Sequence, residues 1–137
     1  MRSDPSLQLT APEREVPDLS QYLNQILRSN GAKTAALVDV ATGMVVRAAG
    51  QAGTALRDAA AGVADEARLA SAALGGASGG GQLEEILMIT RERFQLLKVL
   101  DWRQGDGLLL FVDLERAGTN LGLAAWEVSQ AAASVPG

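Results

Sequence analysis

The chain has 137 residues, and 47% of them are hydrophobic, which is enough to build the core of one domain. Its formal net charge is -4 and the charges are scattered, which argues against nucleic acid and anionic membrane as main partners. The chain contains no cysteine and no histidine, which excludes disulfides, thiol chemistry, Ser-His-Asp catalysis and imidazole metal sites. It has neither a signal peptide nor an apolar run of about 20 residues, so we expect a cytoplasmic protein.

The N-terminal part of the chain predicts a flexible leader followed by a helix. Residues 1–17 hold three of the four prolines and show no helical or strand period, so we expect them to be flexible. Asp18 can cap a helix, with Gln21 completing a capping-box-like pair, and Asn30-Gly31 ends it. The apolar positions of this helix share one face: Leu19, Tyr22, Leu23, Ile26 and Leu27. A strand over residues 33–40, a turn over 41–43 and a second strand over 44–48 follow as a hairpin.

A long helix is predicted over residues 54–74. Its apolar residues are spaced alternately by four and three, which is the seam of a helix packed lengthwise on a partner: Leu56, Ala60, Val63, Ala67, Ala70 and Leu74. Most of the remaining surface is alanine, so neighbours can approach on more than one side, and Gly62 indicates a close approach. The alternative is an ordinary amphipathic surface helix. Residues 75–81 read as a flexible connector.

The second half of the chain predicts three antiparallel strands, at residues 83–90, 93–100 and 107–114. Arg91-Glu92 makes the first turn, and residues 101–106 make the second, ending in the turn dipeptide Asp106-Gly107. These strands are apolar on both faces, so both faces must be covered by helices or by another chain. Thr119 is expected to cap a last helix with Leu121, Ala125, Val128 and Ala132 on one face.

These elements predict an α/β (α+β) domain over residues 18–134, with a tail at 135–137. The fold is a five-stranded antiparallel sheet in the order α-β-β-α-β-β-β-α, with the terminal helices on one face and the long helix on the other. Because the long helix is too slim to cover its face, we expect a homodimer that pairs the long helices and the strands at 83–90. The predicted interface is the seam of the long helix together with Ile86 and Met88.

Candidate chemical sites are few, and no catalytic, cofactor-binding or metal-binding residue is proposed. Residues 31–34 (GAKT) resemble the end of a phosphate loop, but the earlier glycine and the preceding strand are missing. Gly79-Gly80-Gly81 is interpreted as a linker. Trp102 has two interpretations, contact with a partner or packing over the end of the sheet. An enzyme is therefore disfavoured.

Two stretches resemble Roadblock/dynein light chain domains, in their bacterial MglB-like branch. GAKTAALVDVATGMVV (residues 31–46) resembles the opening hairpin of these domains, and residues 84–124 resemble their closing half. The Gly43 turn and the Asn120-Leu121-Gly122 helix start are the sharpest points, and the resemblance covers residues 18–134. It implies a homodimeric, non-catalytic adaptor that binds a small Ras-like GTPase and regulates its nucleotide state. The rival interpretation is a structural dimerisation module in a signalling or motility assembly without a GTPase.

The long helix also carries charges that an alanine seam cannot satisfy, so we expect them on a ridge across the dimer. They are Arg57, Asp58, Asp65, Glu66 and Arg68. Charges of both signs on a flat surface suit a transient partner that docks by complementarity, and the GTPase is expected here with one copy per dimer. The alternative is that these charges only keep the helix soluble.

Overall fold

The computed structural model describes residues 18–51, 54–78, 83–103 and 106–133, and contains three helices and five strands. Their order is the predicted one, and their bounds are α1 (Asp18–Ile26), β1 (Ala32–Asp39), β2 (Val45–Gly50), α2 (Thr54–Ser78), β3 (Glu85–Ile89), β4 (Arg93–Arg103), β5 (Asp106–Glu115) and α3 (Leu121–Ala132). The largest differences from the predicted bounds are at α2, which continues through Gly75-Gly76, and at β4, which continues into the expected turn. The predicted leader, tail and triglycine linker lie outside the described residues.

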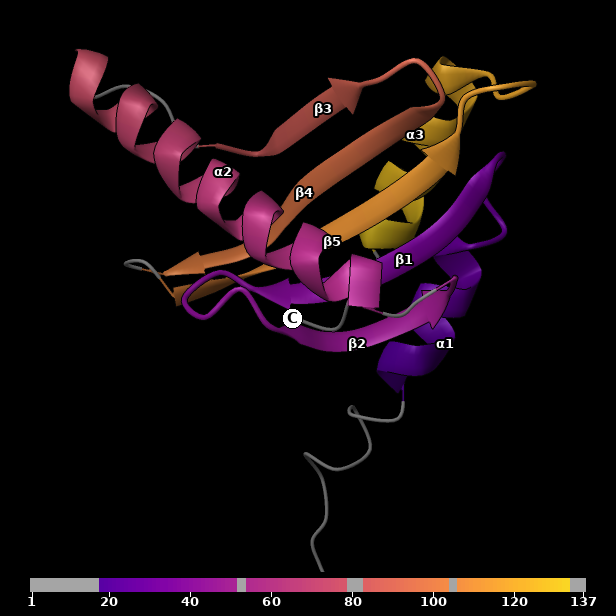
Figure 1. Ribbon diagram of the computed structural model, residues 1–137, viewed down its shortest axis with the longest axis horizontal. Helices are drawn as coiled ribbons and strands as arrows, with labels where there is room; N and C mark the ends of the chain where they lie inside the picture. The colour runs from indigo at the N-terminus through magenta and orange to yellow at the C-terminus, as the bar shows by residue number, and fades with distance from the viewer. Residues whose placement is uncertain (1–17, 52–53, 79–82, 104–105, 134–137) are drawn as a thin grey trace, which may run out of the picture.

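The five strands form one antiparallel sheet in the order β2-β1-β5-β4-β3 (Figure 1). The hairpin β1–β2 and the meander β3–β4–β5 are local pairings, as predicted. The pairing of β1 with β5 joins the two halves of the chain, with Ala36 opposite Phe111. These two central strands carry the most buried residues, and β2 and β3 form the edges.

Helices cover both faces of the sheet, as the two-faced apolar pattern of the strands predicts. α1 and α3 pack on one face and α2 crosses the other (Figure 1). Strand alternation divides β1 between two cores, with Ala35 and Leu37 facing α1 and α3 while Ala36 and Val38 face α2. The predicted inward face of α1 is confirmed for Tyr22, Leu23 and Ile26, all buried in the first core.

The turn at Gly43 brings the first hairpin against α2. Gly43 has φ +74°, and a Cβ there would lie 3.2 Å from the Cα of Ala61. Only glycine combines this backbone conformation with so close an approach to a helix. The expected close approach at Gly62 is not made within the described part of the chain, where no neighbouring atom lies within 4 Å of a Cβ placed there.

The start of α3 differs from the prediction. Asn120, and not Thr119, is the N-cap, and its side-chain oxygen accepts a hydrogen bond from the N–H of Leu123 at 3.0 Å. The Thr119 hydroxyl instead donates to the carbonyl of Glu115. Both residue types are good caps, so the sequence alone left the choice between neighbours open. On α3 the buried residues are Ala124, Val128, Ala131 and Ala132, and Leu121 and Ala125 are partly buried against the same core, which confirms the predicted face.

Tyr22 yields a prediction about stability. Its side chain is buried and its hydroxyl is the one buried side-chain oxygen or nitrogen without a hydrogen-bond partner among the described residues. An unsatisfied buried hydroxyl costs about 1–3 kcal/mol, so Tyr22→Phe should leave stability unchanged or raise it by about 1 kcal/mol in urea unfolding. Leu23→Ala, one position along in the same core, should instead cost about 2–5 kcal/mol.

The same pair of proteins, wild type and Tyr22→Phe, should differ in its response to pH. Burial raises the pKa of the Tyr22 hydroxyl above its ordinary value. The unfolded chain then ionises Tyr22 above about pH 10 while the folded chain keeps it neutral, so the wild type loses stability there. The advantage of Tyr22→Phe should be constant below that pH and should widen above it. An advantage that narrowed on raising the pH would contradict the burial of this hydroxyl.

Candidate functional site

The orientation of α2 decides which of its residues are available to a partner. Its inward face consists of small side chains, namely Ala60, Val63, Ala64 and Ala67, which are all buried against the sheet. The opposite side is exposed from the first turn to the last described side chains, at Ala55, Asp58, Gly62, Asp65, Leu69 and Ala73. Leu69 is 71% exposed in the middle of this outward side. This exposed side of α2, with its charged residues, is the ridge, and it is therefore partly apolar.

The predicted partner-binding charges do lie on α2's exposed surface, with one exception. Arg57, Asp58, Asp65 and Glu66 are exposed. Arg68 is half-buried, because its guanidinium donates to the carbonyl of Val40 and pairs with Asp65. Arg68 and Asp65 therefore fasten α2 to the end of β1. Arg57, Asp58 and Glu66 have no partner in the described part of the chain and are free to meet another protein.

The predicted dimer interface divides into two groups. Ala60, Val63 and Ala67 have at most 5% of their surface exposed and belong to the core between α2 and its own sheet. For these three, packing within the chain accounts for the spacing, and little surface remains for a second copy. Leu56, Ala70, Ile86 and Met88 are partly buried and Leu74 is 41% exposed, so these five retain surface that a second copy can cover.

One free edge of the sheet is β3, whose Ile86 and Met88 pack against the core that α2 covers. The N–H of Thr90 donates to the carbonyl of Arg93, so the two-residue period turns the N–H groups of Leu87 and Ile89 away from β4. No described strand pairs with this edge. β3 is also unevenly covered, because Ile86 and Met88 pack toward α2 while Leu87 and Ile89 are 41% and 55% exposed.

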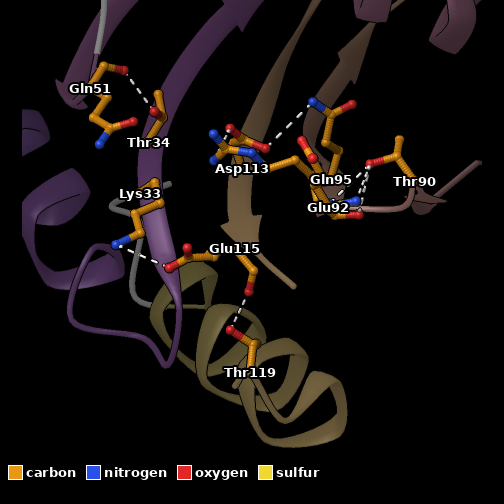
Figure 2. A network of polar contacts seen from close by, with 10 residues as sticks. Lys33, Thr34, Gln51, Thr90, Glu92, Gln95, Asp113, Glu115 and Thr119 are labelled. Carbon is orange, nitrogen blue, oxygen red and sulfur yellow. Dashed lines mark hydrogen bonds and ion pairs between the residues drawn. The ribbon is translucent and has the colours of Figure 1, made fainter. Parts of the chain in front are cut away.

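A row of polar residues crosses the α2 side of the sheet, where apolar residues are expected. Thr34 on β1 lies opposite Asp113 on β5, which in turn lies opposite Gln95 on β4. Figure 2 shows these side chains together. A half-open hollow of about 380 Å³ lies over this row. The polar row forms its floor, and the first turns of α2 form one of its walls. The other lining residues are Gln51, Ala55, Leu56, Ala59, Arg93 and Phe111.

Asp113 is the centre of this polar row. Its carboxylate accepts from Arg93 at 3.2 Å and, at 3.5 Å, from the amide of Gln95 (Figure 2). Its side chain is 19% exposed, whereas that of Arg93 is 40% exposed. One guanidinium N–H of Arg93 is used in this way, and the others can donate into the hollow. The hollow therefore offers donors and acceptors with no net charge, which suits binding of a polar group.

The segment that resembles a phosphate loop is part of the sheet. Residues 32–34 are the first residues of β1, and Lys33 forms an ion pair with Glu115 at 3.4 Å (Figure 2). A phosphate loop connects a strand to a following helix, whereas this segment enters a strand. Among the described residues no three acidic side chains lie together as metal ligands, and no helix is long and apolar enough to cross a bilayer.

The Arg93–Asp113 pair gives a test of what the polar row contributes to stability. Arg93→Leu leaves a mostly buried carboxylate with one weak partner and should cost about 1 kcal/mol, a value reduced because Arg93 is partly in solvent. Adding Asp113→Leu removes that carboxylate and should recover the loss. Urea unfolding of the two variants measures the difference. If the double variant were the less stable one, the row would be a structural element and not an available binding surface.

Two features were missed in the sequence. The polar row could have been found from Thr34, Gln95 and Asp113, each of which interrupts an apolar strand, but only the register shows that they adjoin. Trp126 lies outside the inward face that the helical period of α3 predicts, and it is 60% exposed. The side chain of Trp102 lies outside the described side chains, so both interpretations of that residue stay open.

Comparison with solved structures identifies the fold. The chain is similar to the gliding protein MglB from Thermus thermophilus, with 22% identity and a TM-score of 0.71, over 94% of this chain and 92% of that one. It is similar to an MglB with a tetrameric arrangement, with 22% identity and a TM-score of 0.72, over 96% and 93% of the two chains. It is also similar to a Roadblock/LC7 domain from Streptomyces avermitilis, with 19% identity and a TM-score of 0.66, over 85% and 89%.

The structural neighbours are thus MglB and Roadblock/LC7 domain proteins, which confirms the predicted fold. No protein-family model matches the chain, and no curated protein sequence does. At these identities the likeness establishes the fold alone.

Proposed function

We propose, from this shared fold, that the protein is a non-catalytic homodimeric adaptor that binds a small Ras-like GTPase and modulates its nucleotide state. The observation that carries the proposal is the exposed α2 ridge, where Arg57, Asp58 and Glu66 have no partner among the described residues. A GTPase is the partner that the Roadblock-type resemblance implies. The similarity to gliding protein MglB supports a regulatory role of this kind.

The dimer is proposed to form along β3 and the neighbouring side of α2. β3 is an unprotected edge: its described residues contain no proline and no bulge interrupts its pairing. β2, the other edge, is bulged between its pairings with Leu37 and Val38, and a bulge discourages pairing with another chain. On α2 the residues that retain surface for a second copy away from the ridge are Leu56, Ala70 and Leu74. The tetrameric arrangement of one MglB supports self-association.

The first test of this function concerns the edge strand. Leu87→Pro removes an outward N–H without removing a hydrogen bond to β4, so the fold should remain and the dimer should dissociate. Leu87→Ala is the matched control, because it shortens the same side chain and keeps the N–H. In light scattering at low micromolar concentration the wild type and Leu87→Ala should show about twice the chain mass of 14.2 kDa, and Leu87→Pro should show one chain mass. A wild-type monomer under these conditions would refute the dimer.

The second test concerns the GTPase. Asp58→Lys with Glu66→Lys reverses two free charges on the ridge and leaves the Arg68–Asp65 contact intact. Because these charges are proposed to meet a complementary surface, the double variant should bind a candidate Ras-like GTPase at least about tenfold more weakly, at unchanged dimer mass. The control is Glu84→Lys with Glu92→Lys, which makes the same charge change at exposed sites off the ridge.

The outcome also separates the two candidate functions. Equal weakening by both double variants indicates a general charge effect and removes the ridge as the binding surface. The absence of binding by any candidate GTPase, together with an intact dimer, favours the rival, a dimerisation module of a larger assembly. The isolated protein is expected not to bind GTP in calorimetric titration, since residues 31–34 enter a strand.

A further inference from the structure

The outer face of α3 carries an exposed tryptophan in a chain that is poor in aromatic residues. Aromatic residues make up 4% of the chain. Trp126 is nevertheless 60% exposed on α3, and Leu123, three residues before it, is 46% exposed. The two lie on neighbouring parts of the helix surface. A large indole left in water on a regular helix is a feature of protein interfaces, where tryptophan is among the residues that contribute most binding energy.

The surface around Trp126 is nearly free of charge. α3 has one charged residue, Glu127, whose carboxylate already accepts from the backbone N–H of Asn30 at 2.8 Å. The exposed side chains described on α1 are Ser20, Gln21, Asn24 and Gln25, all uncharged. α2, on the other side of the sheet, exposes four charged residues. Depletion of charge around an aromatic residue is the composition found at the centre of protein interfaces.

A hollow lies next to the exposed indole. It measures about 220 Å³ and is lined by residues of both helices and the turn after α1, with Gln25, Arg28 and Ser29 on one side and Trp126, Glu127 and Gln130 on the other. Its two charged residues, Arg28 and Glu127, have opposite signs. The exposed Trp126 side chain projects next to this hollow. If a two-fold axis relates two copies of the chain, the projecting side chain of each copy faces the hollow of the other, so the surface is complementary to itself.

We propose that this surface, the α3 face (Leu123, Trp126, Gln130 and the adjoining hollow), binds the same face of a second copy of the chain. Trp126 of each copy enters the hollow of the other, and Arg28 of each meets Glu127 of the other. A second copy is favoured over a different protein because the two charges of the hollow, Arg28 and Glu127, have opposite signs, so a two-fold arrangement sets each beside its complement in the other copy. α3 lies on the opposite side of the sheet from α2 (Figure 1), so this contact leaves the ridge on α2 free.

The experiment uses Leu87→Pro as a background so that association through the α3 face is measured apart from the proposed β3 dimer. Light scattering is recorded from micromolar to submillimolar concentration. The mass of Leu87→Pro should rise with concentration from one chain toward two, and adding Trp126→Glu should weaken this association at least about thirtyfold, the equivalent of a hot-spot residue. Adding Met44→Glu, which places the same charge at a residue that is 66% exposed outside both proposed surfaces, should not weaken it.

A second readout follows Trp126 directly. In a Trp102→Phe background the remaining tryptophan should shift its emission to shorter wavelengths as the protein concentrates, because the indole leaves water. If Trp126→Glu fails to fold by circular dichroism, Trp126→Gln takes its place. An unchanged mass over the whole concentration range, an association that Trp126→Glu leaves intact, or a constant emission wavelength overturns the proposal. Loss of the wild-type dimer in Leu87→Pro bears only on β3, so the two proposals fail separately.

Discussion

The structure depends on one constraint: its sheet is apolar on both faces, so helices have to cover each side. β1 and β5 place every second residue in a different core, and neither core is complete without its own helices. On one side, α1 and α3 together cover the sheet. On the other side α2 covers the sheet alone. Its buried residues Ala60, Ala64 and Ala67 are small, so its backbone lies close to the strands. Because the apolar strands must be buried on both faces, the helices have to be divided between the two sides of the sheet.

The same constraint explains what the sequence could and could not predict. The alternation in the strands and the period of the helices predicted every element and the layer each occupies, because these patterns are local. The spacing of Leu56, Ala60, Val63 and Ala67 was predicted to face a second chain, yet Ala60, Val63 and Ala67 face their own sheet. A helical period shows that one side of a helix is covered, and it carries no information about whether the cover belongs to the same chain.

The polar row shows a second limit. Thr34, Gln95 and Asp113 come from three strands and become neighbours through the register of β1, β5 and β4. A shift of one residue would put Asp113 on the opposite face, so the site is a property of the pairing and not of any segment. The ion pair of Arg68 with Asp65 and its bond to Val40 likewise depend on how α2 lies on the sheet. The charges on α2 were predicted as one group, and the fold divides them into a fastening pair and three free charges.

The two helical layers differ in charge, and this difference bears on how each can be used. α2 exposes charges of both signs, which can discriminate among partners because a like-charge pairing costs energy. The layer of α1 and α3 exposes amides, a hydroxyl and an indole, which discriminate weakly by charge and gain from shape and from release of water. A selective contact with another protein therefore fits the exposed charges of α2, and the α3 face fits a second contact between identical copies, in addition to the dimer proposed along β3. Because the sheet separates the layers, contact through the α3 face leaves the exposed charges of α2 uncovered.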